Sequence, residues 1–379
     1  MPLVKVDLGE RSYSVTIEAG AIERLGETIV AAGTPTAVMV ISNPTISRLY
    51  GDPVLESLRK AGVSADLMCV PTGERFKTLT SVRKMYDALI DAHIDRKGAV
   101  VALGGGVVGD MAGFAAATYL RGIDFHQVPT TLLSQVDASV GGKVAVDLPQ
   151  GKNLVGSFHQ PRSVTIDPKT LATLPARELR SGLAEVVKHG IIYDQSFFAF
   201  LDRYASELLE KLECPIVQAI TRSVEIKRDV VQRDEREGGL RAILNCGHTV
   251  GHAIEVLSGY GRYRHGEALA IGLVTEAIIA ERIGFGNAGL ANDIARVLAK
   301  MRLPVGMDAM LATEDIVRAI ELDKKTLGGI FRLALPSRIG ECSVVEVSRE
   351  TLSEGIDAHR AWSPSANSPQ HLPGRERVE

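Results

Sequence analysis

The chain has few of the features that mark secreted, membrane-spanning or nucleic-acid-binding proteins. Its 379 residues include four cysteines, Cys69, Cys214, Cys246 and Cys342, and none stands in a C-x-x-C pair. Neither a disulfide framework nor a cysteine-based metal site is therefore expected, and each thiol is predicted to be a buried small apolar side chain. No apolar run approaches the roughly 18–20 residues that span a bilayer. The N-terminal residues lack a basic segment followed by an apolar stretch, so we expect no secretory signal and a cytoplasmic location.

The chain also lacks an excess of basic charge. The formal net charge is -3, whereas a protein that binds nucleic acid needs a basic face to meet the phosphates. Hydrophobic residues make up 45% of the chain and charged residues 23%, as in an ordinary water-soluble protein. We expect small-molecule chemistry, with neither nucleic acid nor membrane as a partner.

The length predicts two domains, and the sequence pattern changes between them. The first half alternates short apolar strands with helices, which is typical of a mostly parallel sheet with helices on both faces. After Pro175 the chain becomes rich in Ala, Leu, Glu and Lys at helical spacing, and two strands follow late. The expected strands are 37–41, 65–70, 98–103, 329–336 and 342–347, and the expected early helices are 53–61 and 78–93. We predict an α/β domain over 1–177, a helical domain over 178–360 and a disordered tail over 361–379.

A glycine-rich turn follows the third predicted strand. Gly104, Gly106 and Gly109 satisfy G-x-G-x-x-G and lead into a predicted helix over 111–117. Such a turn lets a pyrophosphate approach the backbone at a helix N-terminus, although a tight turn in a buried sheet has the same appearance. Where an acid normally binds the ribose, about 20 residues later, the chain has Pro129-Thr130-Thr131, and the nearest acid is Asp124. Glu74, which follows the second strand, is the candidate for that contact.

Histidines and a carboxylate form a possible metal site in the second half. His248 and His252 are four residues apart on a predicted helix, while Glu185 and His265 lie in separate segments. Two histidines and one carboxylate with an open position suit catalytic zinc. Spacing favours His248 and His252 as the pair, by analogy with H-x-x-x-H helices. It leaves open which three residues bind, and a lone histidine is more often an ordinary surface or core residue.

Several cations stand beside glycines or turns. Arg121, Lys143 and Lys152 each neighbour a glycine, which lets a short loop aim a cation and backbone N–H groups at phosphate. Most single lysines and arginines are simply solvated, so the repeated pattern carries the inference. It predicts an anionic substrate such as a phosphate ester with a carboxylate. Further cations of this set are Lys188, Lys227, Arg241, Lys324 and Lys325.

Many of these motifs, in this order, resemble the 3-dehydroquinate synthase family. The resemblance runs from about residue 10 to about residue 360 and is carried by residues 104–110, 118–122, 129–133, 136–143, 151–154, 184–188, 241–255 and 265–267. It implies a Rossmann-like NAD-binding α/β domain, a C-terminal α-helical metal-binding domain, an active site in the cleft and a homodimer. Cys246 is a departure, since the family commonly has an aromatic residue there.

The resemblance also implies roles for individual residues. The zinc ligands, with cobalt as a possible substitute, match Glu185, His248 and His265, and His252 would handle protons or substrate beside the metal. NAD would be held by residues matching Thr72, Glu74, Lys77, Gly105, Gly106, Val107, Val108, Gly109, Asp110, Thr130, Thr131, Lys143, Lys152, Asn153, Thr170 and Thr173. The substrate would be held by residues matching Asp137, Lys143, Asn153, Lys188, Lys227, Arg241, Asn245 and His252, by one of Lys324 and Lys325, and by Arg121 of the partner subunit.

The implied reaction converts 3-deoxy-D-arabino-heptulosonate 7-phosphate to 3-dehydroquinate and phosphate, a step of the shikimate pathway to aromatic amino acids. The family's sister cyclases, which make valiolone-type or aminated products, are the nearest alternatives. Arg241, Asn245, His252 and the lysine pair at 324–325 favour the dehydroquinate reaction over theirs. A metal-dependent polyol dehydrogenase and a non-enzymatic sensor of NAD and metal are the remaining alternatives.

Overall fold

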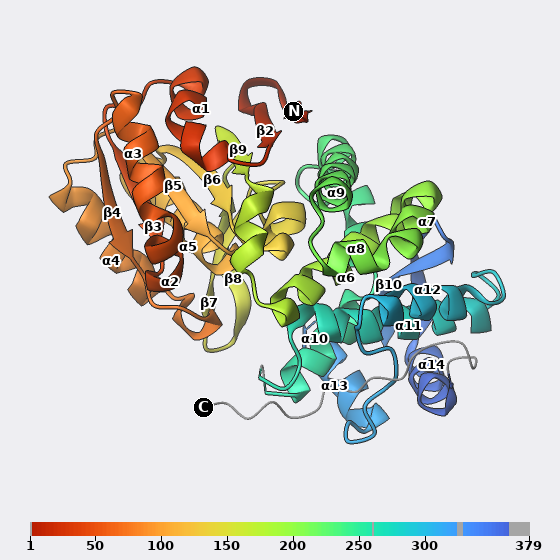
Figure 1. Ribbon diagram of the computed structural model, residues 1–379. Helices are drawn as coiled ribbons and strands as arrows, with labels where there is room; N and C mark the ends of the chain where they lie inside the picture. The colour runs from red at the N-terminus through yellow and green to blue at the C-terminus, as the bar shows by residue number, and fades with distance from the viewer. Residues whose placement is uncertain (1, 260, 324–328, 364–379) are drawn as a thin grey trace, which may run out of the picture. The chain divides into compact units, whose positions relative to one another are not determined.

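The computed structural model describes residues 2–259, 261–323 and 329–363. Two compact units account for the chain (Figure 1). The first contains Met1–Leu174 and Ile216–Arg236, and the second contains Pro175–Pro215 and Glu237–Glu379. Residues 216–236, which we placed in the second domain, thus group with the first unit, because the chain returns to it after crossing over near residue 175. Most of the expected tail, from residue 364 onward, lies outside the described residues.

A seven-stranded sheet forms the centre of the first unit. Its order is β1-β2-β9-β6-β5-β3-β4, antiparallel only between β1 and β2. The strands are β1 (Leu3–Val6), β2 (Tyr13–Ile17), β3 (Val38–Ser42), β4 (Ala65–Cys69), β5 (Ala99–Gly104), β6 (Asp124–Pro129) and β9 (Ser163–Ile166). The accompanying helices are α1 (Leu25–Ala32), α2 (Pro44–Ile46), α3 (Asp52–Lys60), α4 (Leu79–Asp91), α5 (Gly106–Thr118) and α9 (Glu213–Arg233). The predicted parallel α/β architecture is confirmed.

Helices cover both faces of this sheet. Side chains along each strand point alternately to one face and to the other, and both sets are packed against helices. On β3, Met39 and Ile41 pack with α4 and α5, whereas Val38 and Val40 pack with α1 and α3 on the other face. The same division holds along β5. Because successive side chains of a strand point to opposite faces, a strand buried on both must be apolar throughout. The continuous apolar runs in the sequence therefore predicted these strands correctly.

The connections between the strands reverse direction within the sheet, on the two sides of β3. From β3 the chain proceeds outward to β4 and then returns to β5 on the other side of β3. Open parallel sheets bind ligands where the strand order reverses in this way. The glycine turn after β5 stands at this point. A separate hairpin, β7 (Lys143–Leu148) and β8 (Gly151–Phe158), lies against α5.

Helices dominate the second unit. They are α6 (Ala176–Tyr193), α7 (Gln195–Arg203), α8 (Ala205–Leu209), α10 (His248–Leu257), α11 (His265–Arg282), α12 (Leu290–Lys300), α13 (Thr313–Asp323) and α14 (Arg349–Ala361). The two predicted late strands are present as β10 (Ile330–Arg338) and β11 (Glu341–Ser348), and the structure shows that they pair as an antiparallel hairpin. Helix α11 is buried continuously from Gly266 to Ala280 and packs against α6, α10, α12 and α14. A helix that is buried on every side lies in the middle of its domain.

Glycines let the neighbours of α11 come unusually close. A Cβ on Gly266 would lie 2.1 Å from the Ser181 carbonyl oxygen of α6, and one on Gly272 would lie 2.0 Å from the Gly247 carbonyl oxygen. No side chain fits such gaps, so the backbones of α6 and of the turn before α10 are in direct contact with α11. These two contacts hold the three helices in fixed register.

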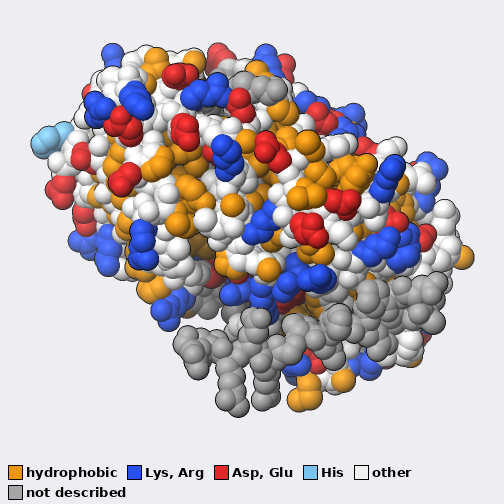
Figure 2. Space-filling view, viewed as in Figure 1, with side chains coloured by type: hydrophobic (Ala, Val, Ile, Leu, Met, Phe, Trp, Pro, Cys, Tyr) orange, Lys and Arg blue, Asp and Glu red, His pale blue; other side chains and the backbone are white. Residues whose placement is uncertain are grey.

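The surface carries both signs of charge. On the face seen in Figure 2, Lys and Arg side chains are interspersed with Asp and Glu. Among the described residues, no helix is long and apolar enough to cross a membrane. The expectation of four buried thiols was wrong for Cys69 and Cys214, which are exposed, and Cys342 is only partly covered. Cysteine burial depends on the strand or helix face occupied, which the isolated residue type does not reveal.

Replacing Gly272 with alanine tests the close approach of α11 to α10. The added methyl group would meet the Gly247 carbonyl oxygen at 2.0 Å, and we expect a loss of about 1–3 kcal/mol in the free energy of unfolding. Gly306→Ala is the matched control, since its Cβ would enter open space. Urea unfolding of both variants provides the measurement. Equal stability of Gly272→Ala and the parent would contradict the contact.

Candidate functional site

Three side chains from three helices of the second unit converge on one point. Glu185 of α6, His248 of α10 and His265 of α11 bring one donor atom each into a common cluster. The Oε1 atom of Glu185 lies 3.3 Å from His248 Nε2 and 3.2 Å from His265 Nε2. Ligands about 2.1 Å from a tetrahedral zinc stand roughly 3.4 Å apart. The spacing of the three donors therefore fits a zinc ion.

The remaining ring nitrogens of both histidines also have partners. His265 Nδ1 lies 3.4 Å from Glu255 Oε2, and His248 Nδ1 lies 3.2 Å from the Cys246 carbonyl oxygen. Metal-binding histidines almost always make such a bond, which fixes the ring orientation and the nitrogen offered to the metal. Both rings are thus held with Nε2 toward Glu185.

Neighbouring charges shift the pKa values of the three donors in different directions. The second oxygen of Glu185 lies 2.5 Å from Lys188 Nζ, and both side chains are almost completely buried. Burial would raise the pKa of Glu185, but the Lys188 ammonium group and His248 hold it well below its usual range. Burial and Lys188 lower the pKa of His248. Burial also acts to lower the pKa of His265, yet hydrogen bonds to Glu185 and Glu255 raise it to about 9. In the metal-free protein His265 therefore carries the proton at neutral pH.

Buried polar contacts position the helix ends that carry these donors. Glu276 of α11 accepts a hydrogen bond of 2.6 Å from the Gly247 backbone N–H, just before α10 begins. A carboxylate there also complements the positive end of the helix dipole. The Ser181 hydroxyl accepts a bond of 2.9 Å from the Gly266 backbone N–H at the start of α11. Glu276 thus fixes His248, and Ser181 fixes His265 relative to α6.

His252 is not part of the donor cluster among the described residues. It is exposed on α10, with its ring centre 5.2 Å from that of His248 and 6.0 Å from that of His265. Spacing alone favoured His248 and His252 as a ligand pair, whereas the geometry groups His248 with two residues from other helices. Helical spacing places two side chains on one face but gives no information on where neighbouring helices direct theirs.

Two other predicted residues, Arg241 and Asn245, lie on the turn η8 (Leu240–Asn245) before α10. Arg241 is 2% exposed. The Asn245 amide donates a bond of 3.1 Å to Glu237. The predicted lysines at 324 and 325 lie outside the described residues.

The glycine turn occupies the carboxyl end of β5 in the first unit. Helix α5 begins at Gly106 and not near residue 111 as predicted, because Gly105 is extended and turns the chain directly into the helix. The first N–H groups of a helix have no partner within it and suit an anionic group. Gly109 also lies close to the neighbouring strand, since a Cβ there would lie 2.9 Å from Gln127 Oε1. Val107 and Val108 complete this first turn.

A network of charges surrounds the start of α5. Lys77 is 4% exposed, and its Nζ lies 2.5 Å from both Asp110 Oδ2 and Asn153 Oδ1. Burial raises the pKa of Asp110 to about 6, against the opposing effect of Lys77. Lys152 of the β7–β8 hairpin lies 3.6 Å from Glu74. The loop after β4, the start of α5 and the hairpin thus meet at one edge of the sheet.

The segment after β6 contributes a buried hydroxyl without a partner. Thr130 is 2% exposed, and its Oγ1 has no hydrogen bond to any described residue. Its backbone N–H donates to the Gly104 carbonyl oxygen at 3.0 Å. An unpaired buried hydroxyl is costly unless a ligand or water satisfies it. The neighbouring Thr131 hydroxyl bonds Ser134 at 2.8 Å and Thr131 abuts Gly105.

The remaining predicted residues of this unit have varied surroundings. Asp137 and Lys227 are partners, with Oδ1 and Nζ 2.6 Å apart, and Lys143 is exposed at the start of β7. Thr173 bonds the Tyr50 hydroxyl at 2.7 Å. Thr170 is buried, and its hydroxyl accepts a hydrogen bond from the Gln135 amide and donates one to the Asp167 carbonyl oxygen. Thr72 is exposed in the loop after β4.

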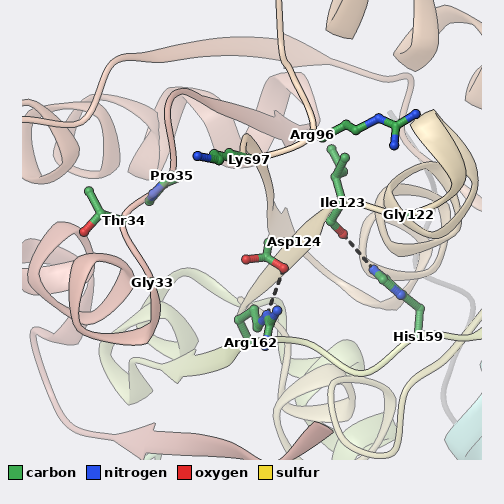
Figure 3. A pocket seen from close by; sticks show the side chains of 10 residues that line it. All are labelled: Gly33, Thr34, Pro35, Arg96, Lys97, Gly122, Ile123, Asp124, His159 and Arg162. Atoms are coloured by element: carbon green, nitrogen blue, oxygen red, sulfur yellow. Dashed lines mark hydrogen bonds and ion pairs between the residues drawn. The ribbon is translucent and has the colours of Figure 1, made fainter. Parts of the chain in front are cut away.

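A cavity of about 470 Å³ in the first unit lies away from all these residues. It adjoins the amino ends of β5 and β6, where Lys97 precedes one strand and Asp124 begins the other (Figure 3). Arg162 Nε is paired with Asp124 Oδ1 at 2.8 Å, and His159 Nε2 with the Ile123 carbonyl oxygen at 2.9 Å. Parallel sheets bind cofactors at the opposite, carboxyl edge. We therefore do not assign this cavity to the cofactor.

Sequence reasoning missed the residues that position the site. Glu255, Glu276 and Ser181 were not predicted, although each supports a donor or a helix end. Glu255 had a usable signal, because an acid seven residues after His248 returns to the same face of the helix. Glu276 and Ser181 had none, since their partners are distant in sequence.

Comparison with known sequences matches two adjoining regions of the chain to known families. Residues 67–181 match the 3-dehydroquinate synthase N-terminal family and residues 182–326 match the 3-dehydroquinate synthase C-terminal family. A 3-dehydroquinate synthase of Pelobacter propionicus is 47% identical over 352 residues, covering 93% of this chain and 98% of the relative. That of Nostoc punctiforme is 46% identical over 358 residues, covering 93% and 97%.

Solved structures agree on the fold. A 2-epi-5-epi-valiolone synthase from Streptomyces hygroscopicus, with NAD+ and Zn2+ bound, has a TM-score of 0.84 at 27% identity and covers 94% of this chain and 98% of its own. A 2-deoxy-scyllo-inosose synthase with carbaglucose-6-phosphate, NAD+ and Co2+ has a TM-score of 0.83 at 26% identity, covering 94% and 100%. A glycerol dehydrogenase from Schizosaccharomyces pombe, at 17% identity and a TM-score of 0.67, shares the fold. The two matched regions and the identities near 45% over nearly the whole chain place this protein in the 3-dehydroquinate synthase family.

Proposed function

We propose that this enzyme converts 3-deoxy-D-arabino-heptulosonate 7-phosphate to 3-dehydroquinate and phosphate, with NAD and a zinc ion as its cofactors. The observation that carries the proposal is the convergence of Glu185, His248 and His265 at zinc-ligand spacing in a chain 47% identical to a 3-dehydroquinate synthase. Cytoplasmic location and assembly as a homodimer belong to the same proposal.

Glu185, His248 and His265 would hold the metal. Their donor spacing and the bonds behind both histidines support this assignment. Three protein ligands leave the open position of a catalytic site. Lys188 neutralises the second carboxylate oxygen of Glu185 and leaves the first for the metal. We therefore assign Lys188 a positioning role in addition to the predicted contact with substrate.

The carboxyl edge of the sheet would hold NAD. The free N–H groups at the start of α5 suit the pyrophosphate, and the unpaired Thr130 hydroxyl supports a polar ligand beside Gly104. Glu74, which is ion-paired with Lys152, would take the role of the carboxylate that binds the ribose in other dinucleotide sites. The other residues at this edge that the sequence predicts as cofactor contacts would help to hold NAD there.

Zinc, when bound, would polarise a substrate hydroxyl, and NAD would supply a hydride acceptor that each turnover restores. The net change is elimination of phosphate followed by intramolecular aldol closure. Lys143, Lys227 and Arg241 would anchor the phosphate and carboxylate, which orients the substrate and offsets its charge. Asp137 holds Lys227 in place through their ion pair. His252, exposed beside the two metal-binding rings, would exchange a proton with a substrate oxygen.

The rival activities have less support. The solved sister cyclases are 26–27% identical to this chain, whereas the curated 3-dehydroquinate synthases reach 47%. The glycerol dehydrogenase likeness, at 17% identity, concerns the fold alone. A dehydrogenase would also release NADH in step with product, which separates it experimentally.

Incubation of the zinc-loaded enzyme with substrate and substoichiometric NAD tests the activity. We expect phosphate and 3-dehydroquinate, the latter measured by coupling to a dehydratase, to form in equal amounts with no net NADH. Phosphate without dehydroquinate would indicate a sister cyclase. Net NADH formation with a simple polyol would contradict the proposal in favour of a dehydrogenase.

Lys143→Ala should lower kcat/KM by about 100-fold or more, because a cation that orients the phosphate is lost. Lys143 is exposed, so the free energy of unfolding should not change measurably. Lys84→Ala, which removes another exposed lysine on α4, is the control and should retain full activity. Unchanged kinetics in the Lys143 variant would refute its assigned role.

Metal affinity should rise with pH. The pKa of His265 is raised to about 9 in the metal-free protein, and binding must displace that proton, so affinity should grow by about tenfold per pH unit below this pKa. Competition against a chromophoric chelator measures this dependence without any assay of activity. Glu255→Gln removes one group that raises the pKa, so its affinity should level off at lower pH. A pH-independent affinity of the parent protein would be inconsistent with His265 as a ligand.

Arg121 is proposed to act in the active site of the partner subunit. Arg121 and Leu120 have φ values of 70° and 49°, a conformation that costs energy for residues other than glycine. Arg121 is exposed and has no ion pair with any residue that the structure describes. A strained turn that presents a cation to solvent supports a role outside its own subunit.

Mixing two inactive variants tests this assignment. If Arg121 serves the partner, a heterodimer of Arg121→Ala and Lys143→Ala subunits contains one site with both residues intact. Random reassociation should then restore about a quarter of the parent activity, since half the dimers are mixed and each has one intact site. If Arg121 serves its own subunit, every site lacks one residue and no activity will return.

A further inference from the structure

One face of helix α6 contacts the start of α11 at three successive points. Arg177, Ser181 and Glu185 follow one another at intervals of four residues on α6, and this spacing places their side chains on the same face of the helix. They contact, in this order, three adjacent residues of α11: Glu267, Gly266 and His265. The contact between Arg177 and Glu267 therefore lies two turns of α6 away from the metal-ligand pair, on the same line of side chains.

We propose that Arg177 is a positioning residue for the metal, because through Glu267 it holds His265 at ligand distance from Glu185. The inference rests on the proposed function, in which zinc binds to these two donors and to His248. The pair of Arg177 and Glu267 contributes to zinc affinity in addition to any contribution to folding.

The guanidinium group of Arg177 binds three acceptors at once. Its Nε donates to Glu267 Oε1 at 2.8 Å, and its Nη2 donates to Glu267 Oε2 at 2.7 Å. The same Nη2 donates to the Arg262 carbonyl oxygen at 2.7 Å. A two-point contact between arginine and a carboxylate fixes the direction as well as the distance of the pair. Helix α6 is therefore bound both to the first turn of α11 and to the segment that leads into it.

Glu267 connects this pair to His265. Its Oε2 also accepts a hydrogen bond of 2.8 Å from the Arg264 backbone N–H, directly before α11 begins. An acid at the third position of a helix commonly makes this bond, which fixes the first turn of the helix. His265 is the first residue of α11 and lies between the two residues that the bond joins. Its backbone direction thus depends on Glu267, whose position relative to α6 depends on Arg177.

The burial of the pair makes the loss of Arg177 costly. Glu267 is almost completely buried, whereas Arg177 is partly exposed. A buried carboxylate without a compensating cation is unfavourable. Removal of Arg177 would therefore drive Glu267 toward water or cause it to take up a proton. Either change weakens the bond to the Arg264 N–H and lets His265 move relative to Glu185.

Zinc affinity of the folded protein is the property to test, measured at one pH by competition with a chromophoric chelator. We expect Arg177→Met to bind zinc about tenfold more weakly than the parent, as is usual when the support behind a metal ligand is lost. Arg177→Lys keeps a positive charge beside Glu267 but lacks the fork of donors, so its loss should be smaller. Urea unfolding of the metal-free proteins gives the stability of each variant separately.

Arg349→Met is the matched control. Arg349 of α14 likewise bonds acids of another helix, Glu314 and Glu321 of α13, and its side chain is 43% exposed against 38% for Arg177. Its loss should lower the free energy of unfolding and leave zinc affinity unchanged. Parent-like zinc affinity in the Arg177 variants would overturn the proposal, whatever their stability. An equal loss of affinity in Arg349→Met would overturn it too. If Arg177→Met does not fold, the lysine variant decides alone.

A double variant tests the route through Glu267. Because Arg177 acts through this carboxylate, Arg177→Met combined with Glu267→Gln should bind zinc no more weakly than the weaker of the two single variants. Additive losses would show that Arg177 acts by another route and would overturn the proposal. A parent protein that binds no zinc would contradict the proposed function as well, whereas zinc binding that the Arg177 variants leave unchanged contradicts the positioning role alone.

Discussion

The contacts of the buried helix α11 with α6 and α10 determine the geometry of the proposed metal site. Gly266 and Gly272 bring backbones so close that a methyl group would overlap a carbonyl oxygen in each case. Glu185, His248 and His265 each lie on one of these three helices. Because dense packing transmits displacements with little relaxation, the separation of their donor atoms follows from the helix contacts. The bonds from Ser181 and Glu276 then fix the helix ends.

Each unit holds buried charges in oppositely charged pairs, and these groups are available for contact with a ligand. In the second unit, Lys188 and the protonated His265 compensate Glu185 and Glu255. In the first, Lys77 compensates Asp110, and Lys227 compensates Asp137. Buried ions are tolerated only when they are paired, so these groups are preorganised before any ligand arrives. Preorganised charge is also the largest usual contribution to enzymatic rate. The same pairs thus account for the stability of the site and for its proposed chemistry.

Local sequence patterns predicted the parallel sheet, its flanking helices and the two late strands, because strands such as β3 and β5 are apolar along both faces. Patterns also found the glycine turn, where Gly109 lies close to Gln127. They could not select the donor triad, since Glu185 and His265 reach His248 from other helices, and helix spacing pointed to His252 instead. The resemblance to the 3-dehydroquinate synthase family supplied the choice of Glu185, His248 and His265.

The most direct test of the account is to locate the metal itself. A crystal structure of the zinc-loaded enzyme, with anomalous scattering recorded at the zinc edge, would place the ion without ambiguity. The account predicts one anomalous peak at about 2.0–2.2 Å from Glu185 Oε1, His248 Nε2 and His265 Nε2, with His252 outside the coordination sphere. A peak coordinated by His252 in place of Glu185 or His265, or no peak near these residues, would contradict it.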